Sequence, residues 1–357
     1  MHSDFKFLNI YKKKKVMVTG STGFKGSWLS FWLKKIGADV IGVGLKPEKN
    51  FILYNSLNLN KLIKQNFLDI TNFSKINRLI KKENPDIIFH LAAQSIVSES
   101  YTDPLTTIKT NVIGSTNILE SVRQNKIKSL VYVTSDKCYR NSEKKIGYSE
   151  KDPLGGFDNY SSSKAAAEIL FKSYHHSFFK SKKLKYATAR AGNVIGGGDM
   201  KKNRIVPDVI KSLQKNKTII IKNPNSTRPW QHVLEPLFGY LKLGYFLMSG
   251  KLNHSDIPSW NFGPYKKNCI KVLRIVKMIE KQWSKKKLNV LVKKDIKNKE
   301  TKLLSLKINK AIKDLNWRPK LNLNENIKLT VEWYKAFTQK KNMEQFSLNQ
   351  IKFFMKK

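Results

Sequence analysis

The chain has 357 residues, enough to bury a sizeable core and to form two domains or one large α/β unit with an appended region. Its 68 Lys and Arg residues against 26 Asp and Glu residues give a net charge of +42, but they are spread along the whole chain without helix-turn-helix, zinc-finger or RNP-like patterns, so we expect no specific nucleic-acid binding. Two cysteines and the lack of a long apolar run exclude a disulfide framework, a cysteine metal cluster and a membrane span, so we expect a cytoplasmic protein without a metal site or membrane insertion.

The first predicted elements are a short buried strand over Val16–Thr19 and a helix over Ser27–Ile36, joined by a glycine-rich turn. The turn has the G-x-x-G-x-x-G spacing. Strand, glycine turn and helix in this order are typical of a dinucleotide-binding site, because glycines let the backbone approach a pyrophosphate at the positive end of a helix. The expected cofactor contacts here are Gly20, Thr22, Gly23, Phe24, Lys25 and Gly26.

The second predicted strand, Asp39–Leu45, lacks the acidic residue that usually binds the adenosine ribose near the carboxyl end of this strand. Lys46 follows the strand instead, and Asp39 opens it, so that Asp39 points away from the cofactor. We interpret Lys46 as an ordinary solvated loop lysine. On these residues alone, NAD and NADP remain alternatives.

A third short strand is predicted over Phe67–Ile70 and a fourth over Asp86–Leu91. Asp69 either meets the adenine amino group or caps the helix that begins near Asn72. His90 lies inside an apolar run, which is typical of a core histidine rather than a base. Small residues after the fourth strand permit backbone contact with a cofactor. This region adds Asp69, Ile70, Leu91, Ala92 and Ala93 to the expected cofactor site.

A helix predicted over Asp103–Arg123 places Asn111 inward, among Ile108, Val112 and Ile118. A buried asparagine needs hydrogen-bond partners. We therefore expect Asn111 to brace the active-site strand.

The residues with the clearest chemistry follow a predicted buried strand, Val131–Thr134. Ser135 stands at its end, and Tyr160 and Lys164 lie on one face at the start of a predicted helix. A lysine ammonium near a phenol favours the phenolate, so we expect the pKa of Tyr160 to fall below its usual value of about 10. Such a tyrosine, sharing a substrate oxygen with Ser135, takes a proton from an alcohol while a hydride leaves its carbon. The alternative is a surface helix on which Tyr160 only packs and Lys164 is solvated.

A sixth strand over Lys185–Ala191 leads into a second half that we expect to bind the substrate. Gly196–Gly198 permits a loop to close over a ligand. Arg228 is the best phosphate ligand, because a guanidinium fork matches a pyrophosphate. The expected substrate contacts are Asn193, Arg204 and Arg228. Beyond Gln339, aromatic residues in a lysine-rich tail leave open an amphipathic interaction helix.

Collinear motifs over roughly residues 14 to 335 resemble those of the extended short-chain dehydrogenases/reductases, a family of Rossmann-fold nucleotide-sugar enzymes that includes NAD-dependent epimerases and dehydratases. The general family motifs are Gly20–Gly26, His90–Gln94, Asn111–Asn117 and Tyr160–Lys164. Further segments are most similar to those of 4,6-dehydratases that act on CDP-glucose. These segments are Gly23–Trp28, Thr134–Tyr139, Asp152–Gly156, Arg190–Asp199 and Arg228–Leu237.

The resemblance implies an α/β fold: a Rossmann-type doubly wound parallel sheet with a smaller C-terminal α/β substrate-binding domain. It implies an NAD-binding domain over residues 12–192, a mainly nucleotide-sugar-binding domain over 193–338, some of whose segments return to the sheet, and a basic tail over 339–357. It also implies NAD as cofactor, CDP-glucose as substrate, and a homodimer formed by the Asp103–Arg123 helix and the helix beginning at Tyr160.

By the same resemblance, the protein is expected to be a hydro-lyase in the synthesis of surface-polysaccharide deoxysugars. Tyr160 takes the proton of the glucose 4-hydroxyl while C4 is oxidised. A base then removes the C5 proton, an acid helps the 6-hydroxyl leave as water, and hydride returns to C6. Asp136 is the acid if burial raises its pKa. Lys137 replaces a glutamate of the dTDP-glucose enzymes and is either the neutral C5 base or a cation that steadies the enolate. The implied catalytic residues are Ser135, Asp136, Lys137, Tyr160 and Lys164.

Two other functions remain as alternatives. A dehydratase or 4-epimerase acting on another nucleotide sugar would share most of these motifs, although an epimerase would not need Asp136 and Lys137. A Rossmann regulatory protein that binds nucleic acid through its basic surface would not need Tyr160, and the intact set of Ser135, Tyr160 and Lys164 argues against it.

Overall fold

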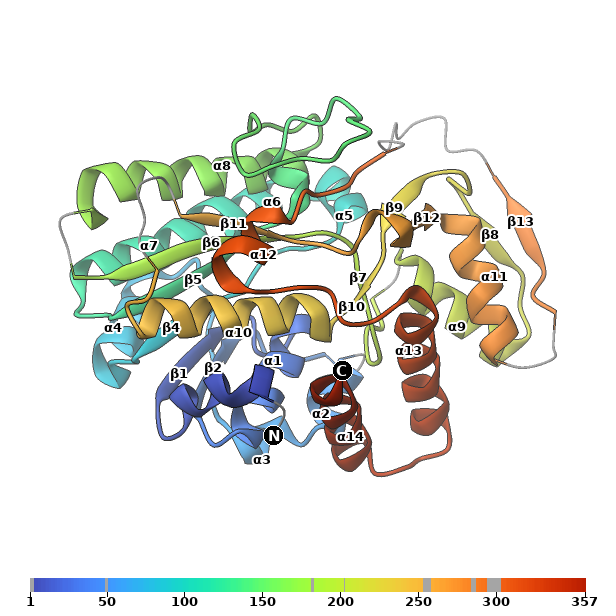
Figure 1. The fold of residues 1–357 in the computed structure, drawn as a ribbon, viewed down its shortest axis with the longest axis horizontal. Coiled ribbons are helices and arrows are strands. Elements are labelled where there is room, and N and C mark those ends of the chain that lie inside the picture. Colours follow the sequence, from blue (N-terminus) through green and yellow to red (C-terminus); the bar gives the residue numbers. More distant parts are fainter. Residues whose placement is uncertain are drawn as a thin grey trace.

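The computed structural model describes residues 3–48, 51–180, 183–201, 203–252, 258–283, 287–293 and 303–357. Its centre is a seven-stranded parallel sheet with the strand order β11-β6-β5-β4-β1-β2-β3 (Figure 1). The strands are β1 (Lys15–Thr19), β2 (Asp39–Gly44), β3 (Lys64–Phe67), β4 (Ile87–His90), β5 (Ser129–Val133), β6 (Lys185–Ala191) and β11 (Ser259–Phe262). The order reverses between β1 and β4, and such a switch point opens a ligand crevice at the carboxyl ends of the strands. The predicted Rossmann-type α/β fold is confirmed.

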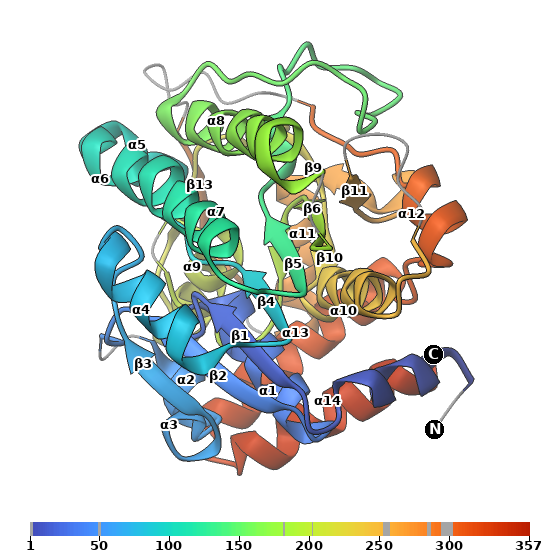
Figure 2. The same ribbon diagram turned by 90° about the vertical axis from the view of Figure 1, so that its left-hand side faces the viewer.

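Helices cover both faces of the sheet (Figure 2). One face packs against α1 (Phe24–Lys35) and α10 (Leu234–Met248). The other face packs against α4 (Phe73–Glu83), α7 (Ser115–Gln124) and α8 (Asn159–Tyr174). Because side chains of a strand alternate between faces, Val16 and Val18 join the first core and Met17 joins the second. Burial on both faces explains why these strands have continuous apolar sequences.

After β6 the chain builds a smaller region, to the right of the main sheet in Figure 1. Its described residues form three two-stranded sheets: β7 (Val194–Ile195) with β10 (Gln231–His232), β9 (Thr227–Pro229) with β12 (Cys269–Lys271), and β8 (Ile219–Ile221) with β13 (Val290–Val292). Its longer helices are α9 (Ile205–Lys215), α11 (Val272–Trp283) and α13 (Leu323–Thr338). The helix α10 and the strand β11 come from the same half of the chain but lie with the main sheet. The exact domain boundaries at 192 and 338 stay a prediction.

The predicted C-terminal tail contains a helix, α14 (Met343–Lys356). Its Phe354 is fully buried, with ring centroids 5.8 Å from that of Trp32 and 5.7 Å from that of Phe238. The Trp333 indole of α13 donates a hydrogen bond to Ser347 Oγ at 2.9 Å. The apolar side of this helix therefore packs against its own chain.

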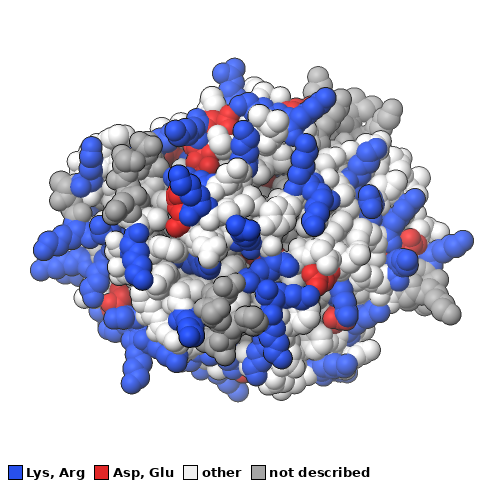
Figure 3. Space-filling view, viewed as in Figure 1, with Lys and Arg blue, Asp and Glu red and all other residues white. Residues whose placement is uncertain are grey.

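The remaining elements are short. They are α2 (Ile52–Ser56), α3 (Leu59–Leu62), α5 (Val97–Thr102), α6 (Pro104–Ile108), α12 (Asn309–Leu315), 3-10 helices over Ser3–Tyr11, Asp136–Cys138 and Lys266–Asn268, and π-helical turns over Lys109–Gly114 and His175–Phe179. No helix of the described part of the chain is long and apolar enough to cross a membrane. Basic side chains are scattered over the face shown in Figure 3 rather than gathered in one patch.

Two predicted boundaries are corrected. The third strand ends at Phe67 instead of beginning there, because β3 stops pairing beside Gly44 and the chain turns at Asp69. The helix predicted over Asp103–Arg123 is divided into α6, a π-helical turn that contains Asn111, and α7.

Candidate active site

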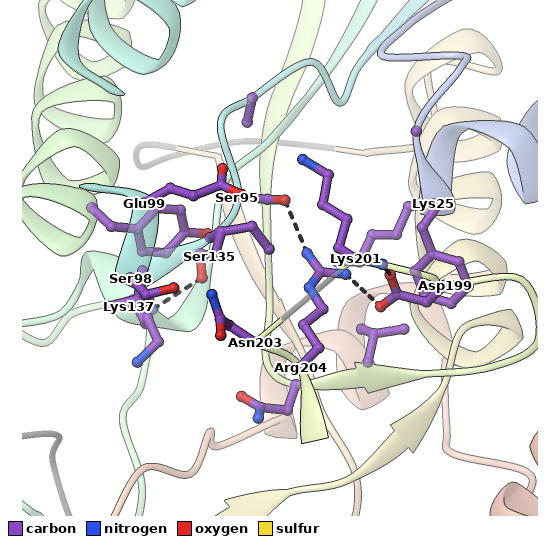
Figure 4. Close-up of a pocket in the computed structure, with 18 of the residues that line it drawn as sticks. Lys25, Ser95, Ser98, Glu99, Ser135, Lys137, Asp199, Lys201, Asn203 and Arg204 are labelled. Carbon is purple, nitrogen blue, oxygen red and sulfur yellow. Dashed lines mark hydrogen bonds and ion pairs between the residues drawn. The ribbon is translucent and has the colours of Figure 1, made fainter. Parts of the chain in front are cut away.

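The predicted cofactor, catalytic and substrate residues all line one cleft of 1770 Å³ (Figure 4). The cleft lies along the carboxyl ends of the parallel strands, since its lining includes residues that directly follow or end β1, β2, β4, β5 and β6. Three segments of the smaller region, near Asn193, Arg204 and Arg228, close its other side. The structure thus brings together every residue that the sequence assigned to the site.

The glycine turn fits the pyrophosphate of a dinucleotide. Gly20 has φ +75°, and a Cβ on Gly26 would lie 2.0 Å from the Gly20 carbonyl oxygen, so a side chain at either position would open the turn. The N-cap of α1 is Gly23, which provides no side-chain hydrogen bond. The amides of the first helical turn therefore stay available to an anion, and Gly23, Phe24, Lys25 and Gly26 all line the cleft.

At the adenosine end, the exposed Lys46 follows β2, as predicted for a loop lysine. Asp69 lines the cleft and accepts a hydrogen bond from the Thr71 amide at 2.9 Å. The cap of α4 is Asn72, whose Oδ1 accepts from the Lys75 amide at 3.0 Å. The alternative in which Asp69 caps this helix is therefore wrong.

Two buried polar residues hold the loops around the cleft. His90 is 1% exposed, and its ring nitrogens lie 2.7 Å from Thr19 Oγ1 and 3.0 Å from Ser115 Oγ, which confirms a core histidine. Asn111 Nδ2 donates to Ser163 Oγ at 2.9 Å, and its Oδ1 accepts from the Gln94 amide at 2.9 Å. Asn111 thus joins the loop after β4 to α8, rather than bracing the strand β5 itself.

The predicted catalytic residues of α8, Tyr160 and Lys164, are buried. Asp158 caps this helix by accepting a hydrogen bond from the Ser161 amide at 2.8 Å, which places Tyr160 and Lys164 in the first two turns. Their exposed fractions are 7% and 4%, so the alternative of a packed tyrosine beside a solvated lysine does not apply. Burial lowers the pKa of Lys164 to about 8.

The expected fall in the pKa of Tyr160 is wrong. Burial raises this pKa to about 12, and the interaction with the Ser135 hydroxyl opposes the rise without cancelling it. Because a buried phenolate loses its hydration, the nearby lysine does not decide the outcome. Ser135 and Tyr160 line the same cleft, as the predicted sharing of one substrate oxygen requires.

The strand-end segment after β5 forms a 3-10 turn that Ser135 caps. The Ser135 hydroxyl donates to Asp136 Oδ1 at 3.0 Å. It also accepts a hydrogen bond from the Lys137 amide at 3.3 Å, and Figure 4 shows these two residues side by side. Asp136 is 2% exposed, and burial raises its pKa, although the charges of Lys137, Lys25 and Arg228 oppose this. The raised pKa is the property that we expected of a general acid at this position.

A buried ion pair lies next to this segment, and it was not predicted from the sequence. Glu168 and Arg190 are both 0% exposed and lie 2.6 Å apart. Glu168 also accepts hydrogen bonds from Thr134 and Thr188, and Arg190 donates to Tyr139 Oη at 2.8 Å. The acidic residue within the apolar run of α8 was the available signal.

The substrate-side residues differ in how they are held. Arg204 donates to Asp199 at 2.6 Å and to Ser95 Oγ at 2.9 Å, so it spans the cleft from the smaller region to the loop after β4 (Figure 4). Sequence reasoning had not assigned Asp199 or Ser95. Arg228 is 3% exposed, and its charge acts on Asp136. Asn193 lies at the start of the smaller region and lines the cleft.

Known proteins resemble this chain in sequence, and solved structures resemble it in fold. The profile of the family described as GDP-mannose 4,6 dehydratase matches residues 17–330. The CDP-glucose 4,6-dehydratase of Salmonella typhimurium is 40% identical over 97% of this chain and 98% of its own length. A UDP-glucuronate 4-epimerase of Thermodesulfobacterium geofontis is 28% identical over 89% of this chain and 95% of its own. Among solved structures, an epimerase of Methanothermobacter thermautotrophicus has a TM-score of 0.81 and 22% identity, over 95% of this chain and 97% of that one.

Proposed function

The chain belongs to the GDP-mannose 4,6 dehydratase family, and on that premise we propose that it is an NAD-dependent CDP-glucose 4,6-dehydratase. The reaction converts CDP-D-glucose to CDP-4-dehydro-6-deoxy-D-glucose and water. The observation that carries the proposal is the buried Asp136, followed by Lys137, in the same cleft as Tyr160 and Lys164. Dehydration needs an acid and a base in addition to the tyrosine, whereas 4-epimerisation does not.

The glycine turn, Asp69, Ile70 and the Leu91–Ala93 segment would hold NAD in this proposal. NAD supplies the hydride acceptor at C4 and the hydride donor at C6. The amides at the start of α1 would bind its pyrophosphate, and the small residues after β4 would permit backbone contact with the cofactor.

The protein's own groups move the protons. Tyr160, aided by Ser135, removes the proton of the 4-hydroxyl, and the ammonium of Lys164 would offset part of the rise that burial causes in the pKa of Tyr160. The resulting 4-ketone acidifies the C5 proton. A base removes the C5 proton, with Lys137 either as that base or as the cation that stabilises the enolate. Asp136 gives its proton to the 6-hydroxyl, which leaves as water. Arg228 and Asn193 bind the nucleotide part of the substrate, and Arg204 closes over it from the smaller region.

The change Lys137→Met tests whether Lys137 takes part in the reaction, either as the C5 base or as a cation that stabilises the enolate. We expect proton loss at C5 to slow by about two to three orders of magnitude, because either a base or a stabilising cation has been removed. Solvent deuterium incorporation at C5 measures this step. Lys137→Arg distinguishes the roles, since an arginine cannot act as the base but keeps the charge. Lys151→Met, a change at an exposed lysine, is the control. Normal C5 exchange in Lys137→Met would exclude Lys137 from the mechanism.

The proposed assembly is a homodimer through α6, α7 and α8. Large apolar side chains on or between these elements are exposed: Leu105 of α6 by 66%, Ile113 of the π-helical turn between α6 and α7 by 51%, and Ile169 of α8 by 54%. An Ile169→Glu change would place a charge in the interface, so we expect the dimer dissociation constant to rise at least about tenfold. Sedimentation velocity measures this, with Phe353→Glu on α14 as a control. A wild-type monomer at all concentrations would contradict the dimer.

The substrate proposal is tested by incubating the protein and NAD with equal amounts of CDP-, dTDP-, UDP- and GDP-sugars, followed by mass spectrometry. We expect loss of water from CDP-glucose alone. Water loss from another sugar would keep the mechanism and replace the substrate, and an isomer of unchanged mass would favour a 4-epimerase.

The proposed location of the reaction is the cytoplasm, where nucleotide sugars and NAD are available.

A further inference from the structure

The side chain of Lys25 makes a contact in the cleft that cofactor binding does not explain. It is the second residue of α1, and its Nζ donates a hydrogen bond to Tyr240 Oη of α10 at 3.3 Å. The same Nζ lies 5.8 Å from the centroid of the Tyr240 ring. The glycine turn binds a pyrophosphate through backbone amides, so the side chain of Lys25 is free for another role.

Lys25 and Asp136 both line the cleft. The two charges interact, with Asp136 favouring the ammonium form of Lys25 and Lys25 favouring the carboxylate form of Asp136. Tyr240, which holds Lys25, is fully buried and also interacts with Asp136 and Tyr160. Figure 4 shows Lys25 and Lys137 at opposite sides of the view, from α1 and from the segment after β5.

Asp136 has an incomplete set of partners among the described residues. Its Oδ1 accepts from Ser135, while its buried Oδ2 has no hydrogen-bond partner there. The charged or titratable groups that act on it or feel its charge are Lys137, Lys25, Arg228, Cys138, Tyr160 and Tyr240. Around Lys25 they are Asp136, Arg204, Lys164 and Tyr240. Lys25 is therefore one of three cations whose charges act on a buried carboxyl group that has one oxygen without a hydrogen-bond partner among the described residues.

We infer that Lys25, held by Tyr240, is a positioning residue for the dehydration step: its ammonium stabilises the carboxylate that Asp136 becomes when it protonates the leaving 6-hydroxyl. This inference rests on the proposed function. In that step the C5–H electron pair forms the C5–C6 double bond, and the C5 proton goes to the base. The C6–O bond breaks with its electrons on oxygen, and the Asp136 proton completes the water molecule.

Of the three cations that act on Asp136, Lys25 is the one that has no other assigned task. Lys137 acts at C5, and Arg228 binds the nucleotide part of the substrate. Burial and the charges of Arg204 and Lys164 lower the pKa of Lys25 to about 8, so the group is still mostly protonated at neutral pH. A cation at this point lowers the barrier for proton release because it stabilises the charge that develops.

The test compares Lys25→Met with Lys25→Arg at saturating NAD. Loss of the positive charge raises the pKa of Asp136, so the alkaline limb of the pH profile for water loss should move up by about one unit in Lys25→Met. The rate of water loss at neutral pH should fall on the order of tenfold. Lys25→Arg keeps the charge and should keep the wild-type limb. If Lys25 only packs or only binds cofactor, both variants lose rate with an unmoved limb, which would overturn the inference.

A second readout needs no turnover. Nuclear magnetic resonance of isotope-labelled aspartate follows the Asp136 carboxyl group directly, with Asp136→Asn to assign its signal. We expect its pKa to rise in Lys25→Met and, by a smaller amount, in Tyr240→Phe, in which Lys25 loses its hydrogen-bond partner. An unchanged pKa in both folded variants would reject the role of Lys25. Wild-type protein that releases no water from any nucleotide sugar would reject the proposed function instead.

Discussion

Tyr160→Phe should lower turnover of CDP-glucose by about three orders of magnitude, within the range for loss of a general acid–base group. The proposed chemistry begins with removal of the 4-hydroxyl proton, and no later step can proceed without it. Phenylalanine keeps the aromatic ring of Tyr160, which is only 7% exposed, so the packing around the ring should not change. The fold and the binding of CDP-glucose should therefore persist.

The measurement is steady-state water loss, together with calorimetry for substrate binding and a thermal melt. Tyr174→Phe is the matched control, because Tyr174 lies on the same helix but bonds to Glu120, outside the cleft. We expect this control to turn over like the wild type. Near-normal activity of Tyr160→Phe would exclude Tyr160 as the base at the 4-hydroxyl.

Arg190→Met should lower the free energy of unfolding by about 3–5 kcal/mol, because it leaves the carboxylate of Glu168 buried without its cation. Both side chains of this pair are 0% exposed. The hydrogen bonds from Thr134 and Thr188 are not sufficient to replace a charge in that environment. Denaturant unfolding measures the loss.

The surface pair of Arg123 and Glu120 provides the comparison. Its side chains are 36% and 22% exposed, so Arg123→Met should cost less than about 1 kcal/mol. A double change of Arg190→Met with Glu168→Gln should recover part of the loss, since no unpaired charge remains. Equal effects of Arg190→Met and Arg123→Met would contradict a structural role for the buried pair.

The sequence predicted the sheet and the lining of the cleft because both depend on local patterns. Apolar strands, the turn over Gly20–Gly26 and the start of α8 each carry their own signal within a few residues. The third strand was misplaced because the apolar residues of Phe67–Ile70 resemble a short strand. In the structure, Phe67 is 53% exposed and is the last residue of β3 that pairs with β2. Local pattern does not determine where pairing with a neighbouring strand stops.

The features that escaped prediction depend on contacts between distant parts of the chain. Lys25 bonds to Tyr240, which is 215 positions away, and Arg204 bonds to Ser95, 109 positions away. The pKa of Tyr160 depends on burial by the whole fold, so spacing from Lys164 gave the wrong direction. Similarly, nothing in the tail shows that Phe354 packs on Trp32.

The proposed dehydratase activity is tested by the reaction of wild-type protein with NAD and CDP-glucose in deuterium oxide. The proposed oxidation, elimination and hydride return predict a product that has lost one water and carries one solvent deuterium at C5. Mass spectrometry gives the first result and proton magnetic resonance the second. An isomer of unchanged mass with no solvent deuterium, or no reaction with NAD shown to be bound, would contradict the proposed dehydratase.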